Sequence, residues 1–204
     1  CFDFVVRDIC APGDTGNWVG PFTFCTPCSP FPTPYAEDFD AVTATSGDFG
    51  NCWSGLPETT TTFSFRSNTG TTTSGSTGPN GDATSGSGVY LYTEASSGTT
   101  GNVAELYSPL FDLTGQTSPE VKFAYHMYGS TIDSLNLDIN DGSGWTNLMF
   151  LQGQQQTASS DPWRDTAVDI SSYSGLIQLR FRVTRGTSFT GDVSIDDVEV
   201  GEPI

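Results

Sequence analysis

Positive charge is scarce in this sequence. Its 204 residues include seven Lys and Arg against 24 Asp and Glu, which gives a formal net charge of −17, and Lys122 is the only lysine. A surface this acidic repels phosphate backbones, so nucleic acid is not an expected partner. The same surface favours divalent cations and basic or neutral ligands.

Long apolar runs and helical periodicity are also missing. No run approaches the roughly 20 apolar residues that a membrane-spanning helix needs, so no membrane span is expected. No window repeats its apolar residues at the spacing of a helix, whereas turn residues recur about every 8–12 residues. No signal peptide opens the chain, which we expect to be a mature segment or an excised piece. The expected fold class is all-β, a sandwich or jelly roll of short strands.

The sequence contains little that could carry catalysis. His126 is the only histidine, and a catalytic histidine needs a paired nucleophile or acid. The Gly-x-Ser-x-Gly nucleophile motif and the Glu-x-Asp-x-x-Glu strand signature of sandwich-fold glucanases are both absent. We therefore expect the chain not to be an enzyme and His126 to be a packed or hydrogen-bonded strand residue.

Cysteine is absent from the last three quarters of the chain, and the five cysteines are Cys1, Cys10, Cys25, Cys28 and Cys52. Cys25-Thr-Pro-Cys28 has the spacing of a zinc ribbon or redox motif, but the chain has no second such pair. Disulfides in a secreted protein explain these cysteines better. Five thiols allow about 15 arrangements of two bridges and one free cysteine. Hairpin geometry favours Cys1 with Cys28 or Cys10 with Cys25, and the sequence leaves the pairing open.

Residues 1–28 form a unit of their own. Apolar residues alternate with polar ones from Phe2 to Arg7, turn residues fill 11–17, and a second strand is expected over 18–24. This hairpin resembles the last two strands of a fibronectin type III-like domain of bacterial secreted proteins. Residues 29–35 contain three prolines, so we expect an extended linker there and a domain boundary within it.

From residue 36 onward, several motifs follow in a fixed order. They are Glu37–Asp40, Gly50–Trp53, Thr77–Thr84, Gly88–Ser96, Ala104–Pro109, Phe123–Gly129, Trp145, Trp163 and Ser194–Val198. In order and spacing they resemble a MAM domain, the extracellular module of meprin, the A5 antigen and receptor tyrosine phosphatase mu. The resemblance covers 36–201, and we assign the domain to 36–204.

Two positions depart from the family pattern. Ala83 stands where the family usually has histidine, and Ala36 stands where animal members often have their first cysteine. The second departure leaves Cys52 without its usual partner, so the disulfide pattern of the family does not transfer. The resemblance implies a jelly-roll sandwich of two antiparallel sheets.

The residue pattern agrees with that fold. Apolar side chains alternate in Leu135–Ile139 and in Leu179–Val183, as strands with one buried face require. In Val193–Val200 the apolar phase slips by one residue at Asp196 and Asp197. Such a slip predicts a β-bulge that re-aims Asp197.

Four acids are candidate metal ligands. Asp38 and Asp40 share a strand face, Asp82 lies in the loop before the strand 89–93, and Asp197 is the re-aimed acid. Hard carboxylate oxygens suit Ca²⁺ better than Zn²⁺ or Mg²⁺, and the resemblance implies a structural cation at this end of the sandwich. Glu37 and backbone carbonyls near Asp82 are possible further ligands. Na⁺ in place of Ca²⁺, and solvated acids with no cation, stay open as alternatives.

Two functions from different classes fit these observations. The first is a non-catalytic extracellular interaction or adhesion module of a multidomain secreted or cell-surface protein, with a protein or glycan ligand and the other domains of its parent chain as partners. The second is a carbohydrate-binding accessory module of a secreted polysaccharide-degrading enzyme. An exposed row of aromatic side chains would favour the second function, and the candidates are Trp53, Tyr90, Tyr92, Tyr125, Tyr128, Trp145 and Trp163.

Overall fold

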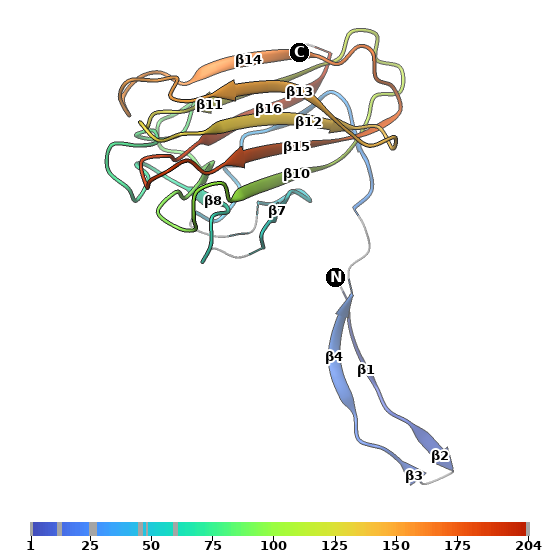
Figure 1. Cartoon of the computed structure of the whole chain (residues 1–204). Helices are drawn as coiled ribbons and strands as arrows, with labels where there is room; N and C mark the ends of the chain where they lie inside the picture. The colour runs from blue at the N-terminus through green and yellow to red at the C-terminus, as the bar shows by residue number, and fades with distance from the viewer. Residues whose placement is uncertain are drawn as a thin grey trace.

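A computed structural model describes residues 2–11, 14–24, 28–44, 47, 49–58 and 61–202. The described residues form strands, turns and loops, and within these ranges no helix is long and apolar enough to cross a membrane. The first strands are β1 (Phe2–Val6), β2 (Ile9–Ala11), β3 (Asp14–Thr15) and β4 (Val19–Phe24). β1 pairs with β4 and β2 with β3, both antiparallel. The predicted hairpin is therefore present, and it lies apart from the sandwich in Figure 1.

The first sheet of the sandwich is built around β10 and β15. Its strand order is β13 (Trp145–Gln152), β12 (Ser134–Asn140), β15 (Leu176–Thr184), β10 (Val103–Asp112) and β5 (Phe31–Pro32). β7 (Ser54–Leu56) pairs with the same edge of β10 as β5 does, at the other end of the strand. Among the described strands of this sheet, only β5 runs parallel to its neighbour.

The second sheet is built around β11 and β16. Its strand order is β14 (Arg164–Asp169), β11 (Glu120–His126), β16 (Ser194–Gly201), β9 (Tyr90–Thr93) and β8 (Phe65–Asn68). β6 (Tyr35–Glu37) pairs antiparallel with β16 beyond the end of β9. Figure 1 shows the two sheets stacked face to face.

The core lies between the sheets. The alternating apolar residues of β12 and β15 are fully buried there, and they pack with Phe123 from β11 and Val198 from β16. The rings of Phe123 and Phe181 meet at 4.9 Å, edge to face, which is a favoured aromatic geometry. The predicted all-β jelly-roll sandwich of antiparallel sheets is confirmed.

The β-bulge predicted at Asp196 and Asp197 is confirmed. Along β11, Lys122 pairs with Glu199 and Ala124 pairs with Asp196, so Phe123 faces one residue too many on β16. Asp197 takes a φ of 48°, a left-handed backbone conformation that non-glycine residues rarely adopt. The bulge allows Val198 to return to the core while Asp197 stays on the outer face.

The predicted linker over 29–35 was only partly right. Phe31 and Pro32 form β5 on the edge of the first sheet, and Tyr35 opens β6 in the second. Prolines are tolerated here because each of these strands pairs along one edge. The segment therefore belongs to the sandwich from residue 31 onward, while the division of the whole chain into domains stays a prediction.

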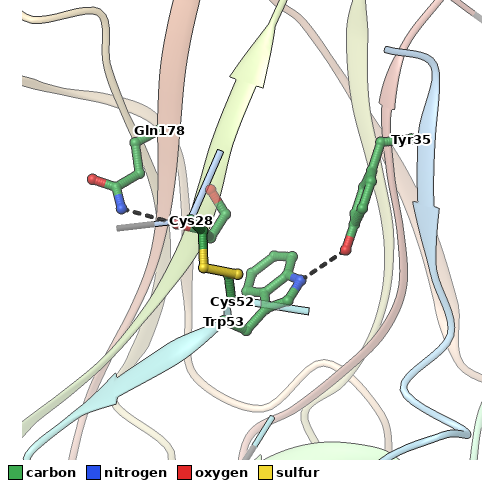
Figure 2. Close-up of a disulfide and its surroundings, with 6 residues drawn as sticks. Cys28, Tyr35, Cys52, Trp53 and Gln178 are labelled. Atoms are coloured by element: carbon green, nitrogen blue, oxygen red, sulfur yellow. Dashed lines mark hydrogen bonds between the residues drawn. A yellow bond between two sulfur atoms is a disulfide. The ribbon is translucent and has the colours of Figure 1, made fainter. Parts of the chain in front are cut away.

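The disulfide Cys28–Cys52 corrects one expectation about the cysteines (Figure 2). A pairing of Cys1 with Cys28 is wrong because Cys28 is bonded to Cys52, which thus has a partner other than the usual one of the family. The reason is that the Pro-containing segment folds back onto the sandwich, which brings Cys28 beside the turn that carries Cys52. The alternative of Cys10 with Cys25 lies outside the described side chains.

Hydrogen bonds reinforce this junction. The indole Nε1 of Trp53 donates to the Tyr35 hydroxyl at 3.1 Å, and that hydroxyl donates to the Glu37 carboxylate at 2.8 Å (Figure 2 shows the first of these). Asn51 Nδ2 also donates to Glu37, at 2.7 Å. Glu37 is thus a buried structural acceptor that joins β6 to the 49–53 turn.

Candidate functional site

Loop segments cover one half of the outer face of the second sheet. The strands under these segments are β9, β16 and β11, whose residues Tyr92, Ser194 and His126 are register partners. The 69–88 and 156–163 segments lie over them, and they meet where Asn80 N donates to the Ser159 carbonyl at 3.0 Å. This end of the sheet therefore has a second small core outside the sandwich.

Aromatic rings fill that small core. Trp163 makes edge-to-face contacts with Tyr90 at 5.6 Å and with His126 at 5.7 Å, and its Nε1 donates to the Gly81 carbonyl at 3.1 Å. The Tyr90 hydroxyl donates to the Gly70 carbonyl at 2.7 Å. Burial lowers the pKa of His126 to about 4, so its imidazole is neutral at physiological pH. His126 is a packed strand residue, as its flanking residues predict.

Acids gather at the border between the covered and open halves. Asp82 accepts hydrogen bonds from Gly88 N at 2.8 Å and from Ser85 N at 3.0 Å, and Asp40 accepts one from Val89 N at 2.7 Å. A Cβ on Gly88 would overlap an Asp40 oxygen and lie 2.9 Å from an Asp82 oxygen. The two carboxylates therefore converge on this glycine, where a side chain would not fit.

The bulge brings two more acids to the same corner. Asp196 accepts hydrogen bonds from Ala83 N and from Asp197 N, each at 2.9 Å, and Asp197 accepts one from Thr84 Oγ1 at 2.6 Å. Hydrogen bonds to Asp196 and Asp197, the two consecutive acids of the bulge, thus hold the 82–84 segment against it. Ala83 takes part through its backbone, so the departure at this position does not remove the contact.

The acids at this corner have shifted pKa values. Burial, assisted by the nearby Asp197 and Asp82 carboxylates, raises the pKa of Asp196 to about 8. Burial also raises the pKa of Asp197, and the carboxylates of Asp38, Asp82 and Asp165 add to the effect. For Asp82, burial acts in the same direction, but hydrogen bonds from Ser85 and Gly88 outweigh it and the pKa falls.

The four predicted ligands can now be placed. Asp40 and Asp82 converge at Gly88, Asp197 is joined to the Asp82 loop through Thr84, and the exposed Asp38 accepts a bond from Asp40 N at 3.1 Å. Within the described residues, no group of three or more His, Cys, Asp or Glu is positioned to hold a metal ion. The predicted cation site therefore stays a prediction.

The sequence analysis missed Asp196, the aspartate whose pKa is raised most. Asp196 is 1% exposed, yet the prediction assigned the functional role to its neighbour Asp197. The phase slip was the available signal, because a bulge leaves two consecutive residues outside the core. Which of the two is buried depends on the 82–84 loop, which is distant in sequence.

The open half of the same face is a groove of about 840 Å³. Four strands supply its floor, and the segments near residues 38, 51 and 84 supply its walls. Its lining residues are Ala36, Glu37, Asp38, Ala41, Asn51, Thr84, Lys122, Phe123, Ala124, Asp165, Thr166, Ala167, Asp197 and Glu199. A groove of this volume is within the usual range for ligand sites.

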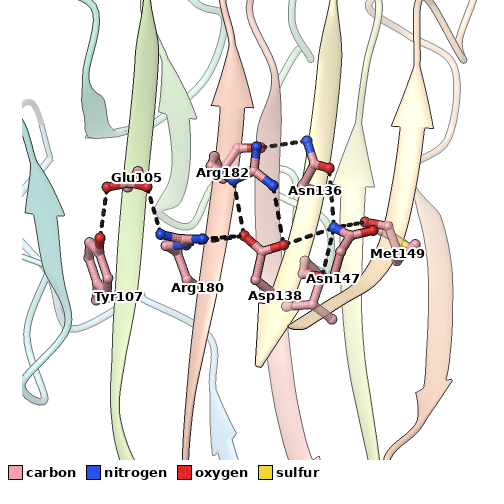
Figure 3. A network of polar contacts seen from close by, with 9 residues as sticks. Glu105, Tyr107, Asn136, Asp138, Asn147, Met149, Arg180 and Arg182 are labelled. Atoms are coloured by element: carbon pink, nitrogen blue, oxygen red, sulfur yellow. Dashed lines mark hydrogen bonds and ion pairs between the residues drawn. The ribbon is translucent and has the colours of Figure 1, made fainter. Parts of the chain in front are cut away.

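The outer face of the first sheet carries a polar network. Asp138 is bonded there to Arg180, Arg182 and Asn147 (Figure 3). The guanidinium of Arg180 lies 4.4 Å from the ring centre of Trp145. The polar groups on this face thus bond to one another, and the Trp145 ring packs against the guanidinium of Arg180.

The buried acids give a testable pH dependence. Burial raises the pKa of Asp192 to about 7 and that of Asp196 to about 8, whereas unfolded aspartate has a pKa near 3.8. Above pH 4 the folded state therefore holds more protons at these sites than the unfolded state does, and stability falls as pH rises through 7 and 8. In metal-free buffer, we expect the melting temperature to drop between about pH 6.5 and pH 8.5.

The pKa of His126 is lowered, so its burial makes the folded state less stable as pH falls below about 6.5. The window from about pH 6.5 to pH 8.5 lies above that range. Asp196→Asn is the matched variant, because it removes the buried carboxyl group whose pKa is raised most. The melting temperature of this variant should fall less between about pH 6.5 and pH 8.5. A wild-type melting temperature that stays level or rises across the window would contradict the assignment.

The chain is similar to known proteins over most of the sandwich. A family model described as MAM domain, meprin/A5/mu, matches residues 47–203. The MAM domain-containing glycosylphosphatidylinositol anchor protein 1 of Gallus gallus is 39% identical over 115 residues, which is 54% of this chain and 12% of that protein. The MAM domain-containing protein 2 of Mus musculus is 35% identical over 133 residues, which is 64% of this chain and 18% of that protein. The chain thus spans less than a fifth of these relatives.

Solved structures support the fold alone. The K2 cleaved adhesin domain of Lys-gingipain aligns with a TM-score of 0.56 at 15% identity, covering 82% of this chain and 97% of that one. The K1 cleaved adhesin domain of Lys-gingipain from Porphyromonas gingivalis W83 aligns with a TM-score of 0.55 at 17% identity and the same coverage.

Proposed function

The chain belongs to the MAM domain family, meprin/A5/mu, and from this premise we propose that it is a non-catalytic interaction and adhesion module of a multidomain secreted or cell-surface protein. The observation that carries the proposal is the family match over 47–203, together with relatives in which the matched region is a small part of a long protein. The printed name of one relative includes a glycosylphosphatidylinositol anchor, which supports a cell-surface or secreted location. The Cys28–Cys52 disulfide fits the same oxidising environment.

Two finer expectations remain proposals. The sequence relatives named above are animal proteins, so a bacterial-type secreted parent rests on the N-terminal hairpin alone. The hairpin pairs as a fibronectin type III-like fragment would, but pairing of two strands occurs in many folds.

The carbohydrate-binding alternative has less support. Of its seven candidate aromatic residues, Trp53, Tyr90, Tyr92 and Tyr125 are buried, and Tyr128, Trp145 and Trp163 are only half-buried. Sugar-stacking platforms need accessible ring faces, and the Trp145 ring already has Arg180 beside it. The acidic groove has no Tyr or Trp among its described lining residues, which favours the interaction module.

Binding arrays can separate the two functions. The purified chain should bind on an array of extracellular proteins and stay silent on an array of polysaccharides, with Trp145→Ala as the matched variant. Binding to one polysaccharide class that Trp145→Ala abolishes would overturn the proposal and favour the carbohydrate-binding module.

We also propose that a structural Ca²⁺ stabilises the acidic corner. The donors there are all hard oxygens from Asp40, Asp82 and Asp197, with Asp38 close by, which is the chemistry that Ca²⁺ prefers. Each carboxylate has about four lone-pair sites, so the observed hydrogen bonds leave positions for a cation. A bound cation would neutralise carboxylates that otherwise repel one another at Gly88 and at the bulge.

Thermal unfolding tests the cation. At a Ca²⁺ concentration of about 100 times its dissociation constant, the free energy of unfolding of EDTA-treated protein should rise by about 2.7 kcal/mol, or roughly 5–10 °C in melting temperature. Asp40→Ala and Asp197→Ala should lose this response, whereas Asp141→Ala, in the exposed turn after β12, should keep it. An EDTA-treated wild type that ignores Ca²⁺ would exclude the proposal, and a response to Na⁺ alone would reassign the ion.

A further inference from the structure

The groove is the one half of the outer sheet face that no described segment covers. Two rows of register partners cross its floor. Ala36, Glu199, Lys122 and Ala167 form the first row, and the bulge, Ala124 and Asp165 form the second. Because outward side chains alternate with core side chains on each strand, all of these residues share the outer face. Small side chains at Ala36, Ala124 and Ala167 leave the floor low between charged neighbours.

Negative charge dominates this groove. Five carboxylates line it, from Glu37, Asp38, Asp165, Asp197 and Glu199, and Lys122 is the only base among the described lining residues. That lysine is already paired, since its Nζ lies 3.0 Å from Glu120 and 4.0 Å from Glu199. Glu37 is satisfied by Tyr35 and Asn51. The remaining acids come from three separate elements and face the same hollow.

We propose that this groove binds a basic, extended segment of a partner protein, with an arginine or lysine side chain placed beside Asp165, which is not among the proposed cation ligands. The inference rests on the proposed function as an interaction module and names the chemistry of its partner.

Dimensions and charge favour this occupant. The floor crosses β6, β16, β11 and β14, and four strands about 4.8 Å apart span roughly 14 Å. An extended peptide advances about 3.3 Å per residue, so four or five residues fit across the floor. Nucleic acid and acidic peptides are repelled by the five carboxylates. A guanidinium can form charge-assisted bidentate bonds with carboxylates, which are stronger than hydrogen bonds between neutral groups.

The edge of the sheet beside the groove is also open. β14 has a free edge there, because its described pairing is with β11 alone.

Peptide binding measured by fluorescence anisotropy tests the proposal. The probe is the dye-labelled peptide Gly-Arg-Thr-Arg-Gly at about 150 mM salt, where long-range attraction is largely screened. Asp165→Asn should weaken binding about tenfold, as expected for loss of a charge-assisted hydrogen bond. Ala167→Arg, on the same edge strand, should weaken it further because it brings the chain's own guanidinium into the groove. Neither residue belongs to the predicted cation ligands, so Ca²⁺ can be kept constant.

The control carries the same change in charge elsewhere. Asp112→Asn, at the half-buried end of β10 in the other sheet, should change affinity less than twofold, and the acidic peptide Gly-Glu-Thr-Glu-Gly should not bind. Equal weakening in the control would mean general attraction to an acidic protein and would overturn the groove assignment, as would no binding of the basic peptide. Binding on the protein array that survives Ala167→Arg would overturn this inference while the proposed function stands.

Discussion

Replacing Cys28 and Cys52 together with serine should lower the free energy of unfolding by about 3 kcal/mol. The bond joins residues 24 apart in sequence, and a cross-link over a loop of this size removes conformational entropy mainly from the unfolded chain. It also holds the segment that carries β5 and β6 beside Trp53. Urea denaturation followed by tryptophan fluorescence measures the change.

The two single variants are the internal control for this experiment. Cys28→Ser and Cys52→Ser should each cost about as much as the double variant, because all three lack the same bond. Single variants near wild-type stability would show that the bond contributes little. Comparing these variants avoids reducing agents, which act on every disulfide of the chain at once.

The disulfide also shows where sequence reasoning fails. Cys52 was expected to lack its usual partner because Ala36 replaces the usual first cysteine, and the actual pairing was left open. The chain instead uses Cys28, which lies eight positions earlier on the far side of the Pro-containing segment. Spacing alone does not reveal this, because the pairing depends on the segment folding back to form β5 and β6.

Local patterns were reliable where one face of a strand is buried. The alternation in 135–139 and 179–183 predicted the core faces of β12 and β15, and the phase slip predicted the bulge at Asp197. Both signals are local, because a strand places side chains on its two faces in turn. They need no knowledge of neighbouring strands.

The groove and the burial of Asp196 are non-local. The groove floor joins Ala36, Ala124, Ala167 and Glu199 from four strands whose order in the sheet differs from their order in the chain. Asp196 is buried where the 82–84 loop donates Ala83 N to it. The sequence marks such residues as acids and alanines, but only the sheet register brings them together.

Replacing Asp138 with alanine should lower the free energy of unfolding by about 3 kcal/mol. Asp138 is 2% exposed and accepts bonds from Arg180 Nη2 at 2.8 Å, Arg182 Nε at 3.0 Å and Asn147 Nδ2 at 2.8 Å (Figure 3). Its removal leaves two guanidiniums without their shared carboxylate. Because their side chains are 15% and 30% exposed, water partly compensates and the cost stays at the low end for a broken buried pair.

Urea denaturation at pH 7 measures this loss, and Asp141→Ala, which removes only exposed hydrogen bonds from Ser143, should cost less than about 1 kcal/mol. Burial acts to raise the pKa of Asp138, but bonds from Arg182, Asn147 and Arg180 outweigh it and lower the pKa. The carboxylate therefore contributes its stability above about pH 4 and loses it as pH falls, so the gap between wild type and Asp138→Ala should narrow in acid. Adding Arg180→Met to Asp138→Ala should cost less than the two single changes added together, because each removes the same interaction. Additive losses would mean that the network in Figure 3 contributes no coupling between its charges.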